Sequence, residues 1–345
     1  MTAKEIIINT AALKPTDRPP AALLSGASWA LRTGGLSMEK VLETTPALVA
    51  DILFGAYRSS GTDIIWGAPG AGNLIIKALG GAVKFRQEGP PDVVEPLLKK
   101  PGDIEKIDIT RLWDDRIMQT LREITRGIVQ RASGEYPVGG SLWGPLTLAT
   151  LMYGAENLMR DMRKHKDAVL QILDFTTTLY LTYTESYIEN GLDIVSMGEP
   201  TASGDMISRE HFAEFVVPAL KKIYATLHRK KVIGMLHICG NISDRLDLVS
   251  SVGARIISLD YKVNLKDARR AFDGKVAFAG NMNPVDVIMG ETPERVAAVC
   301  RQCLADAGEG GGFILMPGCD IPPSTPLENI QAMTQVVRGV DTFQP

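Results

Sequence analysis

The chain has 345 residues, of which 45% are hydrophobic, and a formal net charge of −3, which is enough apolar material for a large core. No run of Lys and Arg stands out, which argues against a nucleic acid partner, and no apolar run reaches the roughly 18 residues that a membrane span needs. Residues 1–20 contain no small-residue cleavage site, and four cysteines do not make a disulfide framework, so we expect a cytoplasmic protein without a signal peptide.

Short apolar segments alternate with longer amphipathic segments along the chain. The short segments are rich in Val, Ile and Leu and stop at Gly or Pro, as buried parallel strands do. We predict eight strands, over residues 21–26, 62–69, 137–145, 192–200, 231–240, 255–261, 275–284 and 312–322. Helical patterns lie between them, the main ones over residues 37–60, 108–133, 146–162, 168–190, 208–230, 292–308 and 325–340.

Eight strands alternating with helices in 345 residues predict an α/β fold, a (β/α)8 TIM barrel. We expect one domain over residues 1–345, with an N-terminal helical extension and an excursion over residues 84–108 that is neither strand nor helix. A doubly wound open sheet is the alternative. Against it, no strand is followed by a Gly-x-Gly-x-x-Gly turn, and the spacing of the glycine-rich segment 67–73 does not match a phosphate loop.

Three side chains at predicted strand ends have the chemistry of metal ligands. His237 and Cys239 lie at the end of the fifth predicted strand, and residues two apart on a strand point to the same face. Cys319 ends the eighth strand, and Asp260 ends the sixth. Since functional side chains of such barrels collect at the C-terminal strand ends, His237, Cys239 and Cys319 could bind zinc, with Asp260 or a water in the fourth position. The alternative is ordinary packing, because a buried Cys is usually a small hydrophobe.

Other strand ends carry weaker candidates. Glu199 ends the fourth strand and is either a catalytic carboxylate of the pocket or a cap for nearby amides. Asn281 and Asn283 end the seventh strand and either position a substrate or cofactor or satisfy loop backbone. The Cys-x-x-Cys pair, Cys300 and Cys303, lies within an amphipathic helix, so we assign it to core packing rather than to the metal site.

Several of these segments resemble a known family. "LHICGN" (236–241), "VAFAGNMNP" (276–284) and "MPGCDIPPSTPLENIQAM" (316–333) look like the second half of the uroporphyrinogen decarboxylase superfamily, and "GGSLWGPLTLATLMYG" (139–154) is similar to its middle motif. The resemblance covers nearly the whole chain and implies a (β/α)8 barrel.

The superfamily implies two alternative chemistries. Its decarboxylases act without metal on a tetrapyrrole with many carboxylates, and they resemble one another in an Arg-rich motif after the first strand and an aspartate after the second. This chain departs from that pattern, because residues 25–28 are Ser-Gly-Ala-Ser and residues 68–69 are Ala-Pro. A polyanionic substrate would need arginines around the mouth, so the departure argues against this branch.

The other branch comprises zinc-dependent cobamide methyltransferases, including the methylcobamide:coenzyme M methyltransferases. His237, Cys239 and Cys319 match the zinc-binding His-x-Cys and distant Cys of that branch, and Asp260 falls where an acidic residue could complete the zinc shell. The resemblance implies Zn²⁺ as cofactor, a methylcobamide carried by a corrinoid-binding partner protein, and methyl transfer to or from a small molecule such as a thiol or tetrahydrofolate.

A corrinoid would need an open, partly apolar barrel mouth. Trp29 follows the first predicted strand and Trp66 lies near the end of the second, and both could offer flat faces to it; ordinary core packing is the alternative. A decarboxylase, a methyltransferase acting on the methyl donor side, and a non-catalytic corrinoid-binding or metal-binding barrel are the alternative functions. The sequence leaves the acceptor, the direction of transfer and homo-oligomer formation open.

Overall fold

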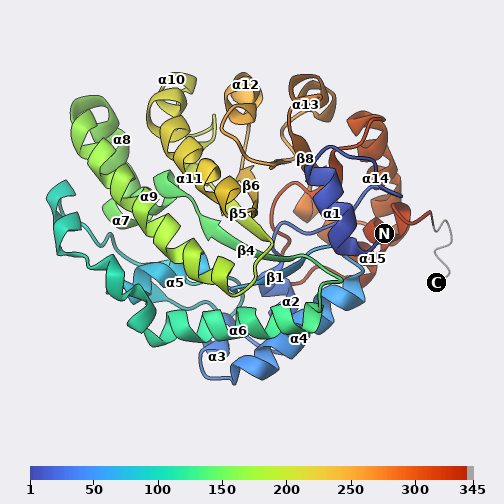
Figure 1. Ribbon diagram of the computed structural model, residues 1–345, viewed down its shortest axis with the longest axis horizontal. Coiled ribbons are helices and arrows are strands. Elements are labelled where there is room, and N and C mark those ends of the chain that lie inside the picture. The colour runs from blue at the N-terminus through green and yellow to red at the C-terminus, as the bar shows by residue number, and fades with distance from the viewer. Residues whose placement is uncertain (340–345) are drawn as a thin grey trace.

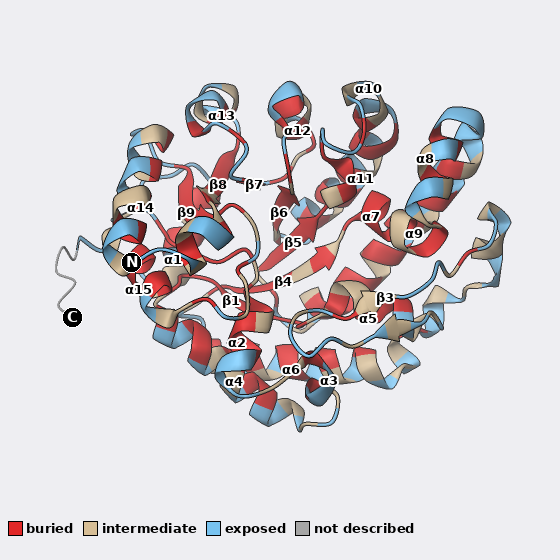
Figure 2. Cartoon of the chain, turned by 180° about the vertical axis from the view of Figure 1, so that it is seen from behind, coloured by how far each residue is buried: buried red, intermediate tan, exposed pale blue. Residues whose placement is uncertain are grey.

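A parallel sheet of seven strands forms the centre of the protein, with helices around it (Figure 1). The computed structural model describes residues 1–339. The strands are buried, as expected for a sheet covered on both faces, while the outer faces of the helices are exposed (Figure 2). In sheet order they are β1 (Ile65–Gly67), β4 (Val138–Trp143), β5 (Ile194–Gly198), β6 (Ile233–Ile238), β7 (Ile256–Leu259), β8 (Ala277–Met282) and β9 (Phe313–Pro317). Each lies within a predicted strand.

The first predicted strand, residues 21–26, is reduced to a single bridge that closes the barrel. Ala21 bridges Leu315 of β9, and the Ala22 amide donates to the Leu315 carbonyl over 3.0 Å. On the other side, the Asp63 amide donates to the Ala21 carbonyl over 2.8 Å. The prediction of a full strand was therefore wrong: the chain turns at Gly26, which has a φ of 71°, into a helix over residues 27–33.

Fifteen α-helices within residues 1–339 pack around the sheet, and most predicted helices are present. The predicted helix over 37–60 is divided before Pro46, and that over 146–162 is divided at Gly154, which has a φ of 88°. The N-terminal extension is helix α1. The helices are α1 (Ala3–Ala11), α2 (Ala27–Thr33), α3 (Met38–Val41), α4 (Pro46–Ser60), α5 (Ala71–Ala78), α6 (Arg116–Ala132), α7 (Pro145–Tyr153), α8 (Ala155–Lys164), α9 (Lys166–Glu189), α10 (Arg209–His211), α11 (Val217–Arg229), α12 (Leu246–Ser250), α13 (Leu265–Phe272), α14 (Pro293–Ala307) and α15 (Leu327–Val336).

The excursion over residues 84–108 contains more regular structure than its sequence indicates. Strands β2 (Val83–Lys84) and β3 (Asp92–Val93) form an antiparallel pair, and a 3-10 turn follows at Pro101–Lys106. A further 3-10 turn, Ile109–Asp114, takes the place of the first residues of the helix predicted over 108–133. The expectation of neither strand nor helix was therefore wrong, because elements this short carry no hydrophobic period.

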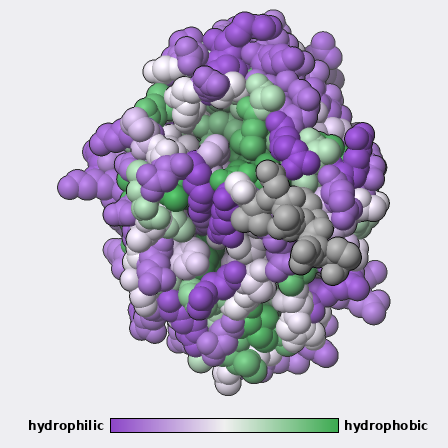
Figure 3. All heavy atoms as spheres, turned by 90° about the vertical axis from the view of Figure 1, so that its right-hand side faces the viewer, coloured by the Kyte–Doolittle hydropathy of each residue, from purple (hydrophilic) through white to green (hydrophobic). Residues whose placement is uncertain are grey.

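The outer surface is mainly polar. Figure 3 shows one face on which hydrophilic side chains predominate and apolar ones gather in smaller patches. None of the helices within residues 1–339 has both the length and the apolar character that crossing a membrane requires. The prediction of a single domain extends to residue 345, and the predicted last helix to residue 340, so both reach beyond the described residues.

Candidate metal centre

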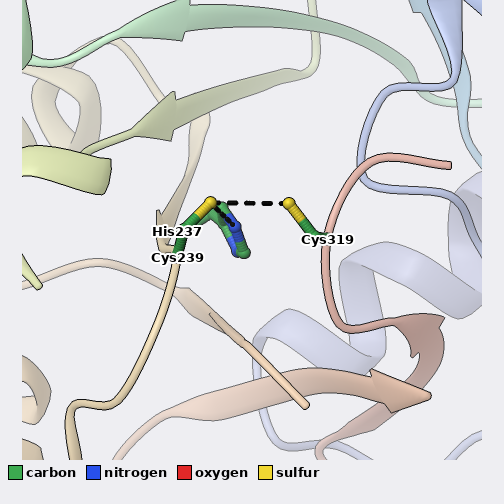
Figure 4. A group of neighbouring side chains, drawn as sticks. All are labelled: His237, Cys239 and Cys319. Carbon is green, nitrogen blue, oxygen red and sulfur yellow. Dashed lines mark hydrogen bonds between the residues drawn. The ribbon is translucent and has the colours of Figure 1, made fainter. Parts of the chain in front are cut away.

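The structure brings His237, Cys239 and Cys319 together at the barrel mouth (Figure 4). The His237 Nε2 atom lies 3.0 Å from the Cys239 Sγ atom, which lies 3.4 Å from the Cys319 Sγ atom. All three donor atoms lie within 4.8 Å of one another. Ligand atoms around a tetrahedral zinc ion are separated by about 3.5 Å, given zinc bonds of 2.0 to 2.3 Å. One imidazole and two sulfurs at this spacing fit a zinc ion with a fourth position to spare.

Two glycines allow the cysteine-bearing loops to pack closely against neighbouring loops of the mouth. Gly240 follows Cys239 with a φ of 86°, and its amide donates to the Asp260 carboxylate over 2.8 Å. Gly318 precedes Cys319, and a Cβ atom there would come within 2.5 Å of the Tyr261 amide nitrogen. A larger residue at either position would strain the backbone or push the loops apart.

The imidazole of His237 is oriented by a residue that sequence reasoning missed. The His237 Nδ1 atom lies 3.0 Å from the Ser258 hydroxyl, and both side chains are buried. Ser258 is the register partner of His237 on the neighbouring strand β7. This contact leaves Nε2 facing the two sulfurs, as expected for a metal-binding histidine with a fixed ring. Only the strand register, which the sequence does not contain, could have identified Ser258.

The two sulfurs influence each other's ionisation. The hydrogen bond from the Cys239 thiol lowers the pKa of Cys319 to about 4, although burial opposes this shift. The same hydrogen bond, together with burial, raises the pKa of Cys239. The pair therefore loses its first proton easily and keeps its second, until a cation takes the place of that proton.

Asp260 lies beside the centre but does not face it. One oxygen of its carboxylate accepts from the Gly240 amide over 2.8 Å, and the other accepts from the Lys262 amide over 3.0 Å. It is not part of the group of donor atoms that includes His237 and the two cysteines. The geometry therefore assigns Asp260 to holding the loop after Cys239, rather than to the fourth ligand position expected for it.

Glu199 is a structural carboxylate rather than a residue of the mouth. It is fully buried, and its oxygens accept from the amides of Leu146 and Thr147, each over 2.9 Å, and from the Thr147 hydroxyl over 2.7 Å. These donors belong to the first turn of α7, where a negative charge is favoured. Burial raises the pKa of Glu199 to about 7, against the effect of the hydrogen bonds. The expected catalytic role is therefore not supported, and the capping alternative is.

The two asparagines also satisfy loop backbone. The Asn281 amide group donates to the carbonyls of Asp260 and Val263, over 3.0 and 2.6 Å. The Asn283 side-chain oxygen accepts from the amides of Val285 and Asp286, each over 3.0 Å. Their polar atoms are thus used by the chain itself, and the expected cofactor-binding role has no geometric support.

The two tryptophans do not offer open faces to a corrinoid. Trp29 and Trp66 are 2% and 1% exposed, and their indole nitrogens donate to the carbonyls of Thr325 and Leu23, each over 3.0 Å. The expectation of exposed faces was therefore wrong, and core packing is their role. Core packing is confirmed for the Cys-x-x-Cys pair, since Cys300 and Cys303 are both buried in α14.

A cavity of about 150 Å³ adjoins the three candidate ligands. Its walls come from the segment after the barrel-closing bridge, the start of α5 and the ends of β4 and β5. Trp143 forms part of the wall, fixed by a hydrogen bond from its indole to Asn73 over 2.5 Å. The cavity also includes Asp320, Ser141 and Ser196, none of which sequence reasoning selected.

Comparison with known proteins places the chain in a family. The family model described as uroporphyrinogen decarboxylase matches residues 2–340. A methylcobamide:CoM methyltransferase of Methanosarcina mazei is 32% identical over 249 residues, covering 72% of this chain and 71% of the relative. Another, from Methanosarcina barkeri strain Fusaro, is 26% identical and covers 93% of both chains. A uroporphyrinogen decarboxylase of Coxiella burnetii is 25% identical and covers 71% of this chain and 70% of its own.

The fold agrees with that placement. A solved structure of a methyltransferase from Methanosarcina mazei superposes with a TM-score of 0.89, covering 98% of this chain and 99% of the other, at 23% sequence identity. A likeness at this identity establishes the fold, and the match to the family over nearly the full length establishes the ancestry. The chain therefore belongs to the uroporphyrinogen decarboxylase family and folds as a barrel of that family.

Proposed function

We propose that the protein is a zinc-dependent methyltransferase that moves a methyl group between a corrinoid carried by a partner protein and a small acceptor. The convergence of His237, Cys239 and Cys319 on one side of an open cavity carries this proposal. The names of the Methanosarcina relatives, which are methylcobamide:CoM methyltransferases, support it. Zinc bound here would hold the acceptor's sulfur as a thiolate, the nucleophilic form.

The lining of the cavity argues against the decarboxylase alternative. Within residues 1–339, no Arg or Lys side chain lines the cavity beside the three ligands. A substrate with many carboxylates would need such cations to replace its lost hydration. Ser25 and Ser28 stand where the decarboxylases have their Arg-rich motif.

The size of the cavity favours a small thiol over tetrahydrofolate. A cavity of about 150 Å³ accommodates a molecule about the size of benzene. A thiol of six to eight heavy atoms fits such a space, whereas a folate would have to remain largely outside it. The four cysteines are all free, which supports a reducing compartment such as the cytoplasm.

Activation of the thiol accounts for only part of the rate enhancement that such a reaction needs. A thiol with a pKa of about 8.5 is roughly 3% ionised at pH 7, so complete ionisation gains about thirtyfold, or about 2 kcal/mol. The remainder must come from holding the sulfur in line with the methyl group. The walls of the cavity supply that alignment.

The direct test combines metal analysis with methyl transfer. Purified protein should contain about one zinc per chain and should transfer the methyl group of methylcobalamin to a small thiol, followed by the change in corrinoid absorbance. The double variant Cys239→Ser/Cys319→Ser should lose both the zinc and the activity.

The matched control is Cys300→Ser/Cys303→Ser, which removes two cysteines that lie within α14 and outside the site. It should retain zinc and activity. Full activity in a metal-free protein, or release of carbon dioxide from uroporphyrinogen, would overturn the proposal. Tight corrinoid binding without any methyl transfer would favour the non-catalytic alternative.

A further inference from the structure

Two serines on neighbouring strands line the cavity. Ser196 of β5 is 1% exposed, and its hydroxyl has no hydrogen-bond partner among residues 1–339. Its register partner on β4 is Ser141, which is half-buried and lines the same cavity. Buried hydroxyls in folded proteins are nearly always paired. An unpaired one that borders a cavity therefore points to a ligand atom as its missing partner.

The pair lies at a depth that a short molecule bound at the metal centre can reach. Gly198 is the register partner of His237, and Ser196 lies two residues earlier on the same strand and faces the same side. At about 3.3 Å per residue, the Ser196 hydroxyl lies about 7 Å below the level of the imidazole. A two-carbon linker extends about 4 Å from a sulfur to its end group, which suits this separation once a hydrogen bond is added.

The surroundings of the pair are poor in positive charge. Among the described residues that line the cavity, Asp320 is the one Asp, Glu, Lys or Arg, and it brings a carboxylate beside the two sulfurs. Arg32, the first arginine after the barrel-closing segment, is paired with Glu88. The start of α5 offers backbone amides, which favour negative charge, but its lining residues Ala71, Gly72 and Asn73 bring no side-chain cation. An anionic end group would therefore meet a carboxylate without a side-chain cation to balance it.

We infer that the acceptor is a short thiol whose far end is an uncharged group with a hydrogen-bonding oxygen, held by the hydroxyls of Ser196 and Ser141. This inference rests on the proposed function, since it places the acceptor's sulfur at the metal centre. It assigns selectivity to hydrogen bonding instead of charge, so the affinity for the acceptor should depend little on ionic strength.

The test compares four thiols of similar length on the zinc-loaded protein without corrinoid. Isothermal titration calorimetry would measure the binding of 2-mercaptoethanol, 2-mercaptoethanesulfonate, 2-aminoethanethiol and ethanethiol, each corrected for its own thiol pKa. We expect 2-mercaptoethanol to bind about tenfold more tightly than the sulfonate. The variant Ser196→Ala should weaken 2-mercaptoethanol binding by about five- to tenfold and leave ethanethiol unchanged.

The matched control is Ser186→Ala, which changes a buried serine of α9 that does not line the cavity and should leave all four affinities unchanged. Thermal unfolding checks that both variants fold. A sulfonate that binds more tightly than 2-mercaptoethanol, or an equal loss of ethanethiol binding in Ser196→Ala, would overturn the inference. Binding of none of the thiols to zinc-loaded protein would overturn both the inference and the proposed function. Selective binding without methyl transfer would overturn the proposed methyltransferase function and leave only a thiol-binding site at these serines.

Discussion

The two halves of the barrel mouth differ in what they contribute. The half built by β6, β7 and β9 carries the three candidate metal donors and the serine that orients His237. The half built by residues 24–28, α5, β4 and β5 presents mainly Ser, Ala and Gly, because its bulky Trp29 and Trp66 side chains are turned into the core. The first half determines which chemistry is possible, and the second determines which molecules can enter.

The largest effect should follow from removing a donor of the first half. Structural zinc sites bind with about 10 to 16 kcal/mol in total, so each ligand contributes about 3 kcal/mol. We expect His237→Ala to weaken zinc binding more than about a hundredfold, measured by competition with a chelator. The zinc-depleted protein should then form a Cys239–Cys319 disulfide under mild oxidation, since the sulfurs lie 3.4 Å apart, detected as a mass loss of about 2 Da. Unchanged zinc affinity in His237→Ala would show that His237 is not a zinc ligand and that the metal does not bind in this half.

Glu199→Gln tests a buried carboxylate that belongs to neither half. A glutamine amide would face backbone amides in place of a carboxylate oxygen, so we expect a loss of about 2 to 3 kcal/mol in unfolding free energy, measured in urea at pH 8. The pKa of Glu199 is raised from 4.5 to about 7 in the folded chain. Between these values the unfolded chain binds fewer protons, so wild-type stability should fall as pH rises from about 4.5 to about 7.

The glutamine variant should lack this pH-dependent decline, because glutamine does not titrate in that range. Its activity per folded molecule should stay within a few-fold of wild type. A loss above about a hundredfold in a folded variant would instead give Glu199 a catalytic role.

Ser258→Ala tests whether the half that carries His237 needs a hydrogen bond to orient this imidazole. Loss of the hydroxyl removes the hydrogen bond that orients His237, and changes of this kind weaken metal binding by about 10- to 100-fold. Chelator competition would measure this change, and Ser258→Thr, which keeps a hydroxyl, should restore part of the affinity. Equal zinc affinities for the wild type, Ser258→Ala and Ser258→Thr would show that the His237 imidazole does not need the Ser258 hydrogen bond.

The smallest effect is expected from Trp66→Phe in the second half. The variant leaves the Leu23 carbonyl without its donor, which should cost about 1 to 2 kcal/mol of stability. Because Trp66 is buried, the KM for methylcobalamin should not change. A KM that rises severalfold while stability is unchanged would show that the indole contacts the corrinoid.

The sequence was informative where function depends on strand ends. His237 and Cys239 are two residues apart on one strand and so face the same side, and Cys319 lies at the end of another strand. This spacing predicts that the three side chains converge, without knowledge of side-chain packing. Which face a side chain turns to was not predictable for Trp29 or Glu199, because each follows a strand segment and its direction depends on the loop. Trp66 lies within β1, and the sequence does not show which face of that strand is turned to the mouth. Ser196 and Ser258 needed the strand register. A full strand was predicted around Ala21 because residues 21–24 are apolar. They are apolar because they are buried, although only Ala21 forms a bridge to a neighbouring strand.

The closing bridge between Ala21 and Leu315 has a consequence for how the site matures during synthesis. The side of Ala21 that faces β9 stays unpaired until this last strand emerges, and Cys319 follows that strand closely. At roughly 5 to 20 residues per second, the 80 residues that separate Cys239 from Cys319 take roughly 4 to 16 s to synthesise. During that interval the nascent chain holds His237 and Cys239 without Cys319, so on the proposed function the complete set of metal donors would exist only after Cys319 has been added.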